Sequence, residues 1–258
     1  MRFFLYLVKR DLKTRFAGSS LGVAWFFLQP FLNFLVYAAV FGMLFKFNVS
    51  FKGKNVEFLP FFLSGFWPWM AFQEGIMRAS GILGEYAHVI KKVRFPLELL
   101  VPTAIVAPQF YFLFGSVSMV AFLIYGYGFH LGDFSNLFLL LLPFGIQLFI
   151  SFGLGLMGAI LNVYAKDLLA WLPTVFNLWF FATPIFYSEE IVPERYVWLL
   201  KLNPMFPVVK AYRDVFFQNT LSHDTIFALG GSACFAVFSV LMGLFLFSRG
   251  KRWLADVL

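Results

Sequence analysis

Residues 137–163 read LFLLLLPFGIQLFISFGLGLMGAILNV, a run of 27 residues without a charged side chain. A helix needs about 20 mostly apolar residues to cross a hydrocarbon core of about 30 Å, so this run predicts a transmembrane helix. Within it, Ser151, Gly155 and Ala159 recur at every fourth residue. Small residues at this spacing let helix backbones approach closely, so we expect this face to pack against another helix.

Five more apolar segments lie on either side of this run, and polar residues separate them. They cover residues 23–45, 58–79, 98–126, 171–187 and 226–248. Each has a length that can cross a bilayer as a helix. We therefore expect an all-α integral membrane protein with six transmembrane helices, in which residues 1–258 form a single membrane domain.

The region between the fifth and sixth segments, residues 188–224, has a different pattern. It carries nine charged residues, and its apolar pieces, 197–202 and 208–217, are short. Pieces of this length are typical of re-entrant or interfacial helices, and Asn203-Pro204 predicts the turn between two of them. We interpret the acidic group Glu189, Glu190 and Glu194 as solvated loop charges.

The composition excludes a soluble globule and gives an orientation. Hydrophobic residues make up 61% of the chain and charged residues 13%, against about 25% charged residues in an average soluble domain. With both termini inside, 13 Lys and Arg residues lie on the cytoplasmic side and 7 outside. This bias predicts cytoplasmic termini, and membrane topology accounts for the net charge of +7 without a nucleic-acid partner.

Two segments are predicted to lie outside the bilayer on the cytoplasmic side. Residues 1–20 place apolar side chains on one helical face and cations largely on the other, which is typical of a helix on the membrane surface. The cations of this segment are Arg2, Lys9, Arg10, Lys13 and Arg15. Residues 84–94 form a polar stretch between the second and third spans, which predicts a short cytoplasmic helix or loop.

Motifs of enzyme sites and cofactor sites are missing from the sequence. Gly53-Lys54 and Gly250-Lys251 lack the upstream glycine spacing and the following Ser or Thr of a phosphate-binding loop. His, Cys and carboxylate residues nowhere have the spacing of metal ligands, and the single Cys234 cannot form an intramolecular disulfide. We therefore expect no catalytic residue, metal or cofactor in this chain.

Charged residues near the hydrocarbon are costly and usually have a partner or a function. Glu74 and Arg78 stand four residues apart near the inner end of the second span, in the order that suits an ion pair on a helix. We interpret them as a structural ion pair.

Aromatic residues form stripes on the first and fifth spans. Their positions are Phe27, Phe31, Phe34, Tyr37 and Phe41 on the first span, and Phe176, Trp179, Phe180 and Tyr187 on the fifth. Aromatic faces stack on the C–H faces of sugars, and Tyr and Trp add a polar group for hydroxyls, so the stripes could line a passage for a glycan. Lipid-facing or core Phe is the alternative, since the chain holds 39 Phe residues.

Several strings resemble the membrane subunits of polysaccharide-export ABC transporters. KRDLKTRF at residues 9–16 and SSLGVAW at 19–25, which Gln29-Pro30 follows, are similar to the entry signature of that family. Further similar strings follow in the family's order, namely VRFPLE at 93–98, Lys166-Asp167, TPIFY at 183–187 and Asn203-Pro204. The family usually has Arg where this chain has Lys166, which keeps the charge but loses the planar guanidinium.

The resemblance is closest to O-antigen exporters and implies a half-transporter of the inner membrane. It implies a homodimer that works with two copies of a separate ATPase, which binds ATP and Mg, and a cargo of polyprenyl-diphosphate-linked glycan. Residues 84–94 would dock on the ATPase, through Glu85, Tyr86, His88, Lys91, Lys92 and Arg94. The basic residues of the first helix are candidates to bind the lipid diphosphate, and the helices of 188–224 would gate the outer exit.

Other functions remain open at this stage. An ABC-2 exporter of teichoic acid, capsule, lipid or drug would have the same membrane fold. A membrane enzyme that acts on polyprenyl-linked sugars would need a carboxylate or histidine group at the membrane surface, for which Glu189, Glu190 and Glu194 are the densest acidic group.

Overall fold

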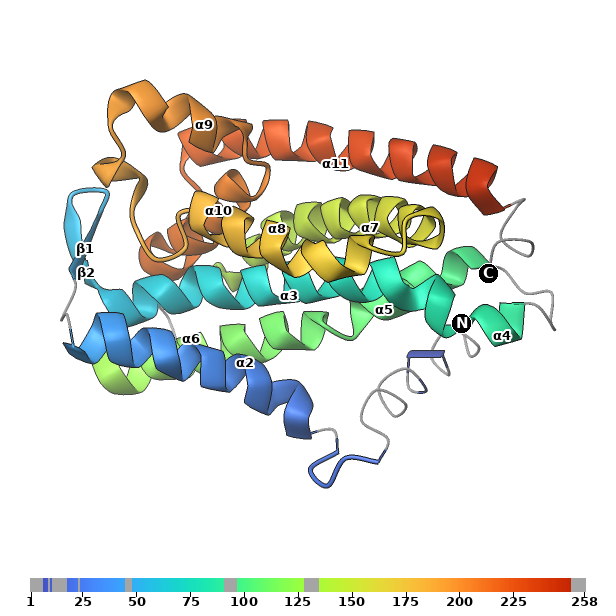
Figure 1. Ribbon diagram of the computed structural model, residues 1–258. Helices are drawn as coiled ribbons and strands as arrows, with labels where there is room; N and C mark the ends of the chain where they lie inside the picture. The colour runs from blue at the N-terminus through green and yellow to red at the C-terminus, as the bar shows by residue number, and fades with distance from the viewer. Residues whose placement is uncertain are drawn as a thin grey trace.

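The computed structural model describes residues 7–8, 10, 18–22, 24–44, 48–90, 97–127 and 135–251. In this part of the chain most residues are helical, and the long helices run roughly side by side (Figure 1). Some predicted site residues lie outside the described residues, namely Arg2, Lys9, Lys13, Arg15, Lys91, Lys92, Arg94 and the side chain of Phe27.

Helices occupy all six segments that the sequence predicts as spans. In chain order they are α2 (Ala24–Tyr37) with the π-helical η1 (Ala38–Leu44), α3 (Phe58–Glu85), η2 (Leu97–Leu99) with α5 (Leu100–Val106) and α6 (Gln109–Tyr127), η4 (Leu137–Leu140) with α7 (Leu141–Tyr164), α8 (Leu168–Ala182), and α11 (His223–Gly250). Between α8 and α11 lie the short helices η5 (Glu189–Ile191), η6 (Glu194–Tyr196), α9 (Val197–Leu202) and α10 (Met205–Gln218), and the four-residue α4 (Ala87–Ile90) follows α3.

Three of the described helical segments are long and apolar enough to cross a membrane, namely Leu97–Gly126, Leu137–Tyr164 and His223–Gly250. Leu28–Gly42 and Leu168–Ala182 are apolar but shorter. Helix α3 has 28 residues and does not reach the same hydropathy, because it contains Gln73, Glu74 and Arg78. A crossing by all six helices stays a prediction.

The ends of the helices differ from the predicted ends for local reasons. The fifth helix ends at Ala182 rather than residue 187, because Pro184 disfavours helical backbone at the residue before it, and Thr183 is extended. The sixth helix begins at His223, directly after Ser222, whose backbone is extended. In the predicted cytoplasmic stretch 84–94, α3 continues to Glu85 and only Ala87–Ile90 forms a separate described helix.

A small β-hairpin joins the first two spans, and the sequence analysis did not predict it. Strands β1 (Asn48–Phe51) and β2 (Lys54–Glu57) are antiparallel, with Phe51 opposite Lys54. Lys52 and Gly53 form the two-residue turn, and both have positive φ, as the turns that suit the twist of hairpin strands require. We call this end of the bundle the hairpin end and the opposite end, where α4 lies and α11 finishes, the α4 end (Figure 1).

Small residues bring the central helices into close contact. A Cβ at Gly153 of α7 would overlap the backbone of Ser239 in α11, and a Cβ at Gly155 would lie 2.8 Å from the Cβ of Ala79 in α3. Ser151 and Ala159 on the same helix are fully buried. The predicted packing face of the fourth span is therefore confirmed at Gly155, which packs on α3, whereas Gly153 on another side of α7 contacts α11.

A buried polar chain connects three helices at the middle of the bundle. The side-chain amide of Gln147 in α7 donates to the carbonyl of Pro68 in α3 at 3.0 Å, and its oxygen accepts from the hydroxyl of Tyr212 in α10 at 3.0 Å. Gln147 and Tyr212 are fully buried. Buried polar groups must be paired, so these hydrogen bonds fix the register of α3, α7 and α10 relative to one another.

The glycines of α7 allow a matched test of this packing. Gly153→Ala should destabilise the protein by about 1–3 kcal/mol, because the added methyl group has no room against Ser239. Gly145→Ala is the control, since no atom lies within 4 Å of a Cβ at that position, and alanine favours helix. Thermal unfolding in detergent measures both variants, and an equal effect of the two substitutions would contradict the packing.

Candidate functional site

The aromatic stripes predicted on the first and fifth spans meet each other in the structure. The ring of Tyr37 in α2 lies 5.7 Å from that of Phe180 in α8, and Phe41 stacks on Phe186 at 5.9 Å between ring centroids. Phe34 reaches α3, where it stacks on Phe62 at 6.3 Å. Aromatic residues of α2, α3 and α8 thus form one continuous cluster.

The members of the two stripes differ in exposure. Phe31 is 42% exposed, whereas Phe34, Tyr37, Phe41 and Trp179 are half-buried within the cluster. Phe176 and Phe180 are buried against Trp69 of α3. Phe176 and Phe180 therefore serve the core of this chain, and the open aromatic edge lies at Phe31. The role of the stripes in lining a passage stays a prediction.

The polar groups of Trp179 and Tyr187, in the aromatic stripe of the fifth span, form hydrogen bonds near the end of α8. Trp179 donates from Nε1 to Oδ1 of Asn203 at 2.9 Å, and the amide nitrogen of Asn203 donates to the hydroxyl of Thr183 at 2.8 Å. Asn203 Oδ1 also accepts the backbone N–H of Met205, at the start of α10, at 3.0 Å. Tyr187 donates its hydroxyl to the carbonyl of Phe181 at 3.1 Å. Asn203 thus fixes the turn before α10 against the end of α8.

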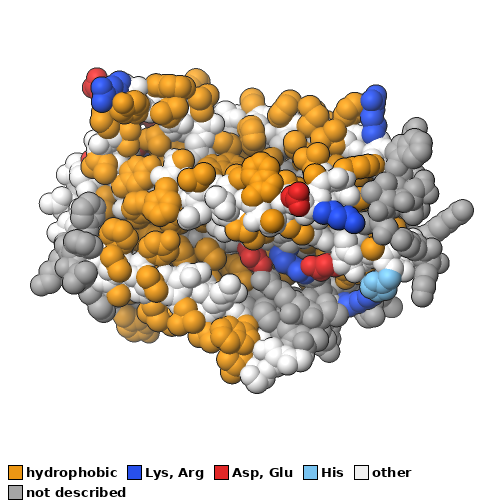
Figure 2. All heavy atoms as spheres, in the orientation of Figure 1, with side chains coloured by type: hydrophobic (Ala, Val, Ile, Leu, Met, Phe, Trp, Pro, Cys, Tyr) orange, Lys and Arg blue, Asp and Glu red, His pale blue; other side chains and the backbone are white. Residues whose placement is uncertain are grey.

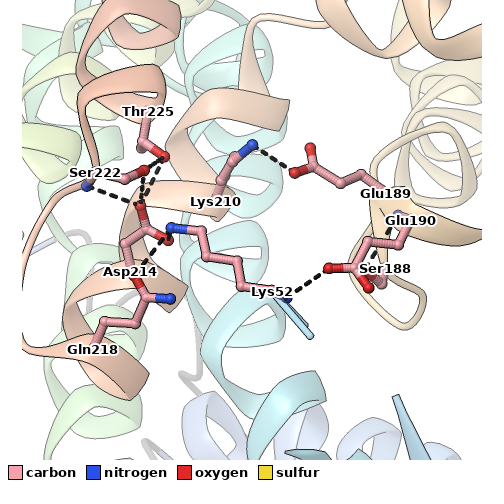
Figure 3. A network of polar contacts seen from close by, with 9 residues as sticks. All are labelled: Lys52, Ser188, Glu189, Glu190, Lys210, Asp214, Gln218, Ser222 and Thr225. Atoms are coloured by element: carbon pink, nitrogen blue, oxygen red, sulfur yellow. Dashed lines mark hydrogen bonds and ion pairs between the residues drawn. The ribbon is translucent and has the colours of Figure 1, made fainter. Parts of the chain in front are cut away.

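A buried carboxylate organises the polar contacts at the hairpin end (Figure 3). Asp214 of α10 is fully buried and accepts hydrogen bonds from the hydroxyls of Ser222 at 2.8 Å and Thr225 at 2.7 Å. Lys52, from the turn of the hairpin, places Nζ 2.7 Å from Oδ1 of Asp214 and 3.0 Å from Oε1 of Gln218. Because removal of one partner would leave the Asp214 charge buried without compensation, this contact holds the hairpin firmly to α10.

The same junction extends to the segment after α8 (Figure 3). Glu190 accepts hydrogen bonds from the backbone N–H of Lys52 and the hydroxyl of Ser50, and Glu189 pairs with Lys210 of α10. Glu190 is exposed and Glu189 half-buried, as expected of solvated charges, but both also have specific partners, which the sequence analysis did not predict. Their partners lie far away in the sequence, so only the fold could reveal them. We call the group Lys52, Glu189, Glu190, Lys210, Asp214, Ser222 and Thr225 the outer junction.

Arg213 adds a buried cation next to the outer junction. It is 3% exposed, donates from Nη2 to the carbonyl of Ile185 at 2.6 Å, and places Cζ 3.6 Å from the ring centroid of Phe61. Burial lowers the pKa of this guanidinium to about 9, against the opposing charge of Glu189, so it stays charged at neutral pH. The TPIFY string at 183–187 is thus held to α10 through its backbone.

At the α4 end, the described residues of the predicted docking segment contact the start of the chain. Arg10 places its guanidinium carbon 5.2 Å from the ring centroid of Tyr86, which is buried. Glu85 pairs with Arg78 at 3.0 Å, and His88 is exposed on α4. The structure therefore places the predicted interface helix and the predicted docking segment side by side at Tyr86.

On the second span, the structure pairs Arg78 with Glu85, whereas the sequence analysis predicted a pair of Arg78 with Glu74. Arg78 Nη1 lies 3.0 Å from Glu85 Oε1, and Glu74 stands one turn before Arg78 on the same helix. The pairing of Glu74 with Arg78 stays a prediction. A further pair at this end, Lys251 to Glu98 at 2.6 Å, joins the end of α11 to the start of the third span.

Comparison with known proteins agrees with this architecture. The ABC-2 type transporter family matches residues 2–217. An O-antigen export system permease protein, RfbA, from Klebsiella pneumoniae is 25% identical over 98% of this chain and 93% of its own length, and an RfbA from Myxococcus xanthus is 30% identical over 83% and 80%. The polysialic acid transport protein KpsM from Escherichia coli is 22% identical over 93% and 90%.

The family match includes the hairpin, the aromatic cluster and all but the last residue of α10. It agrees with the apolar helices, which identify an integral membrane protein. The family match covers well over half of the residues, from the first segment into α10. The chain therefore belongs to the ABC-2 type transporter family.

Proposed function

We propose that this protein is the permease subunit of an ATP-driven exporter that moves a polyprenyl-diphosphate-linked polysaccharide of the O-antigen type across the inner membrane. The family and the relatives that are named O-antigen export permeases support the direction and the class of cargo. ATP hydrolysis would take place in a separate partner subunit, because the sequence contains no phosphate-binding loop. Both termini would lie in the cytoplasm.

Two copies of the chain would enclose the passage between them. The observation that carries this proposal is the continuous aromatic cluster of α2, α3 and α8, whose open edge includes Phe31. Aromatic rings give a sugar chain stacking surfaces without deep binding sites, so the chain can slide. The buried members, Phe176 and Phe180, would hold this surface in place rather than touch the cargo.

The partner ATPase would act on the α4 end. Contact between Arg10 and Tyr86 joins the first segment to the docking segment, so a push on one would move the other. At the hairpin end, the outer junction would hold the short helices closed until α8 moves. The basic residues of the first segment, among them Arg10, would receive the lipid diphosphate at the inner leaflet by charge attraction.

Teichoic acid or capsule is the second candidate class of cargo, and the similarity to the polysialic acid transport protein favours capsule within it. A drug or lipid exporter with this fold would show ATPase stimulation by small amphiphiles and normal surface glycan after deletion. A membrane enzyme is disfavoured, because Glu189 and Glu190, two of the three residues in the densest acidic group, are engaged in the outer junction.

Phe31→Ala tests the aromatic surface. We expect several-fold less surface glycan in a deletion strain that carries this variant, because a stacking surface at the open edge of the cluster is lost. Phe238→Ala is the matched control, since Phe238 on α11 is also exposed, at 57%, and lies outside the cluster. Immunoblots of surface glycan and of the permease measure export and expression. Equal export by both variants would refute the aromatic lining.

Charge reversal tests the docking segment. Lys91→Glu with Lys92→Glu should strongly reduce co-purification of the ATPase, because the basic segment would lose its attraction for the partner. The control is Arg195→Glu with Lys201→Glu, which reverses two charges between α8 and α10, towards the opposite end of the bundle. Unchanged co-purification of the first variant would contradict the assignment of residues 84–94 to the ATPase interface.

A further inference from the structure

Helix α3 changes character halfway along its length. From Phe58 to Trp69 all residues except Leu59 are buried, and six of them are Phe or Trp. From Met70 to Glu85 a stripe of residues becomes half-buried or exposed, while the remaining residues stay buried. The polar half begins at Gln73, which accepts a hydrogen bond from Nε1 of Trp69 at 3.0 Å.

The accessible residues of this half share one side of the helix. At about 100° per residue they fall within an arc of about 140°. We give the name α3 stripe to six of them: Gln73, Glu74, Met77, Arg78, Gly81 and Glu85. The opposite side packs on apolar helices, because Gly75 faces Ile105 of α5 and Ala79 faces Gly155 of α7.

The α3 stripe lies deep enough to be inside the membrane. Pro68 is level with Gln147 of α7, and Ser80 is level with Gly158, so α3 and α7 run together in the same direction. Arg78 is then level with residue 156 and Glu74 with residue 152, so at about 1.5 Å per residue they lie about 12 Å and about 18 Å from the end of α7 at Tyr164. For a hydrocarbon core of about 30 Å whose edge is level with Tyr164, Glu74 lies closer to the midplane than the sequence-predicted end of the span at residue 79 implied.

The α3 stripe lies between α2 and α8, the two spans that carry the aromatic stripes. In the hairpin half, Phe34 of α2 packs on Phe66 and Trp67. In the α4 half, α2 diverges from α3 towards its first residue, while α8 stays alongside, with Leu169 next to Gly81 (Figure 1). Figure 2 shows acidic and basic side chains right of centre on the visible face, towards the α4 end, with hydrophobic side chains to their left.

Charged side chains at this depth indicate what the stripe contacts. Charged side chains at the centre of a helix in lipid are costly to insert, so such groups face protein, water or a substrate path. The Arg78–Glu85 pair and Glu74 together carry a net negative charge. A stripe of this charge does not attract a diphosphate, whereas its carboxylates, amide and guanidinium can exchange hydrogen bonds with hydroxyl groups.

We propose that the α3 stripe lines the cytoplasmic half of the glycan passage, where Gln73, Glu74 and Arg78 exchange hydrogen bonds with the sugar hydroxyls of the moving chain. The inference rests on the proposed export function and adds a third wall to the aromatic surfaces of α2 and α8. The passage is then polar and hydrated in its cytoplasmic half and narrows into the aromatic cluster towards the hairpin end.

Cysteine labelling tests the position of the stripe independently of the cargo. In a Cys234→Ser background, the assembled exporter in lipid nanodiscs carries Met77→Cys or, as control, Leu241→Cys on α11, where Leu241 is 63% exposed. A charged, water-soluble maleimide should label the first variant at least about tenfold faster, because thiolate forms only where water reaches the sulfur. Equal slow labelling of the two variants would overturn the proposal. A disulfide between the introduced cysteines of two Met77→Cys copies, without labelling, would also overturn it.

Photo-crosslinking then tests contact with the cargo. A photoreactive amino acid in place of Met77 should yield adducts that antibodies against the exported glycan detect in exporting cells, and the same amino acid in place of Leu241 should yield none. Labelled Met77→Cys without glycan adducts, in cells that export glycan, would refute the sugar contact. If the cells export no glycan through this protein, the proposed function fails while the labelling result stands.

Paired substitutions at Glu74 test the hydrogen bonds themselves. Glu74→Gln keeps an acceptor and should retain most export, whereas Glu74→Leu should reduce it several-fold at equal protein level, because the hydroxyl groups lose a partner. Surface glycan per unit of membrane protein is the readout. Wild-type export by Glu74→Leu would overturn the role of Glu74.

Discussion

Helix α3 contains Glu74, Arg78 and Glu85, whereas the other long helices of the bundle are apolar. Because exposing such charged groups to hydrocarbon is costly, they limit how the neighbouring helices can pack on α3. Helices α5 and α7 cover the side of α3 that holds glycine, alanine and serine, where backbones can approach closely. The polar side is left between α2 and α8, the two spans with aromatic stripes. In the proposed exporter, this polar side is where a hydrophilic path would run.

At the hairpin end, too, a charge is removed from water, but there it is buried and paired inside the protein. Asp214 is fully buried, so its charge needs partners, and the fold supplies Lys52 from the hairpin and hydroxyls from the start of α11. Glu189 and Glu190 extend these contacts to the segment after α8. The outer junction is therefore a set of mutually dependent contacts, and any opening of this end must break several of them together.

The two ends of the bundle suit different tasks in an exporter. At the α4 end, the contact of Arg10 with Tyr86 brings the first segment to the docking segment, where a partner could act on both. At the other end, Asn203 links Trp179 of the aromatic cluster to the first residues of α10. A movement of α8 would reach α10 directly through this asparagine, because one side chain holds both elements.

The sequence by itself determined the class of fold and the family resemblance. Long apolar runs can be stable only as helices in a bilayer, so the six helical segments and the small-residue face of 137–163 followed from composition and spacing. The aromatic stripes were visible for the same reason, since the helical period places them on one face. Tertiary structure alone decided which of these aromatic residues are core, that Lys52 pairs with Asp214, and that Glu189 and Glu190 are structural. These contacts join segments far apart in the chain, and local periodicity carries no information about which distant charge will satisfy a buried one.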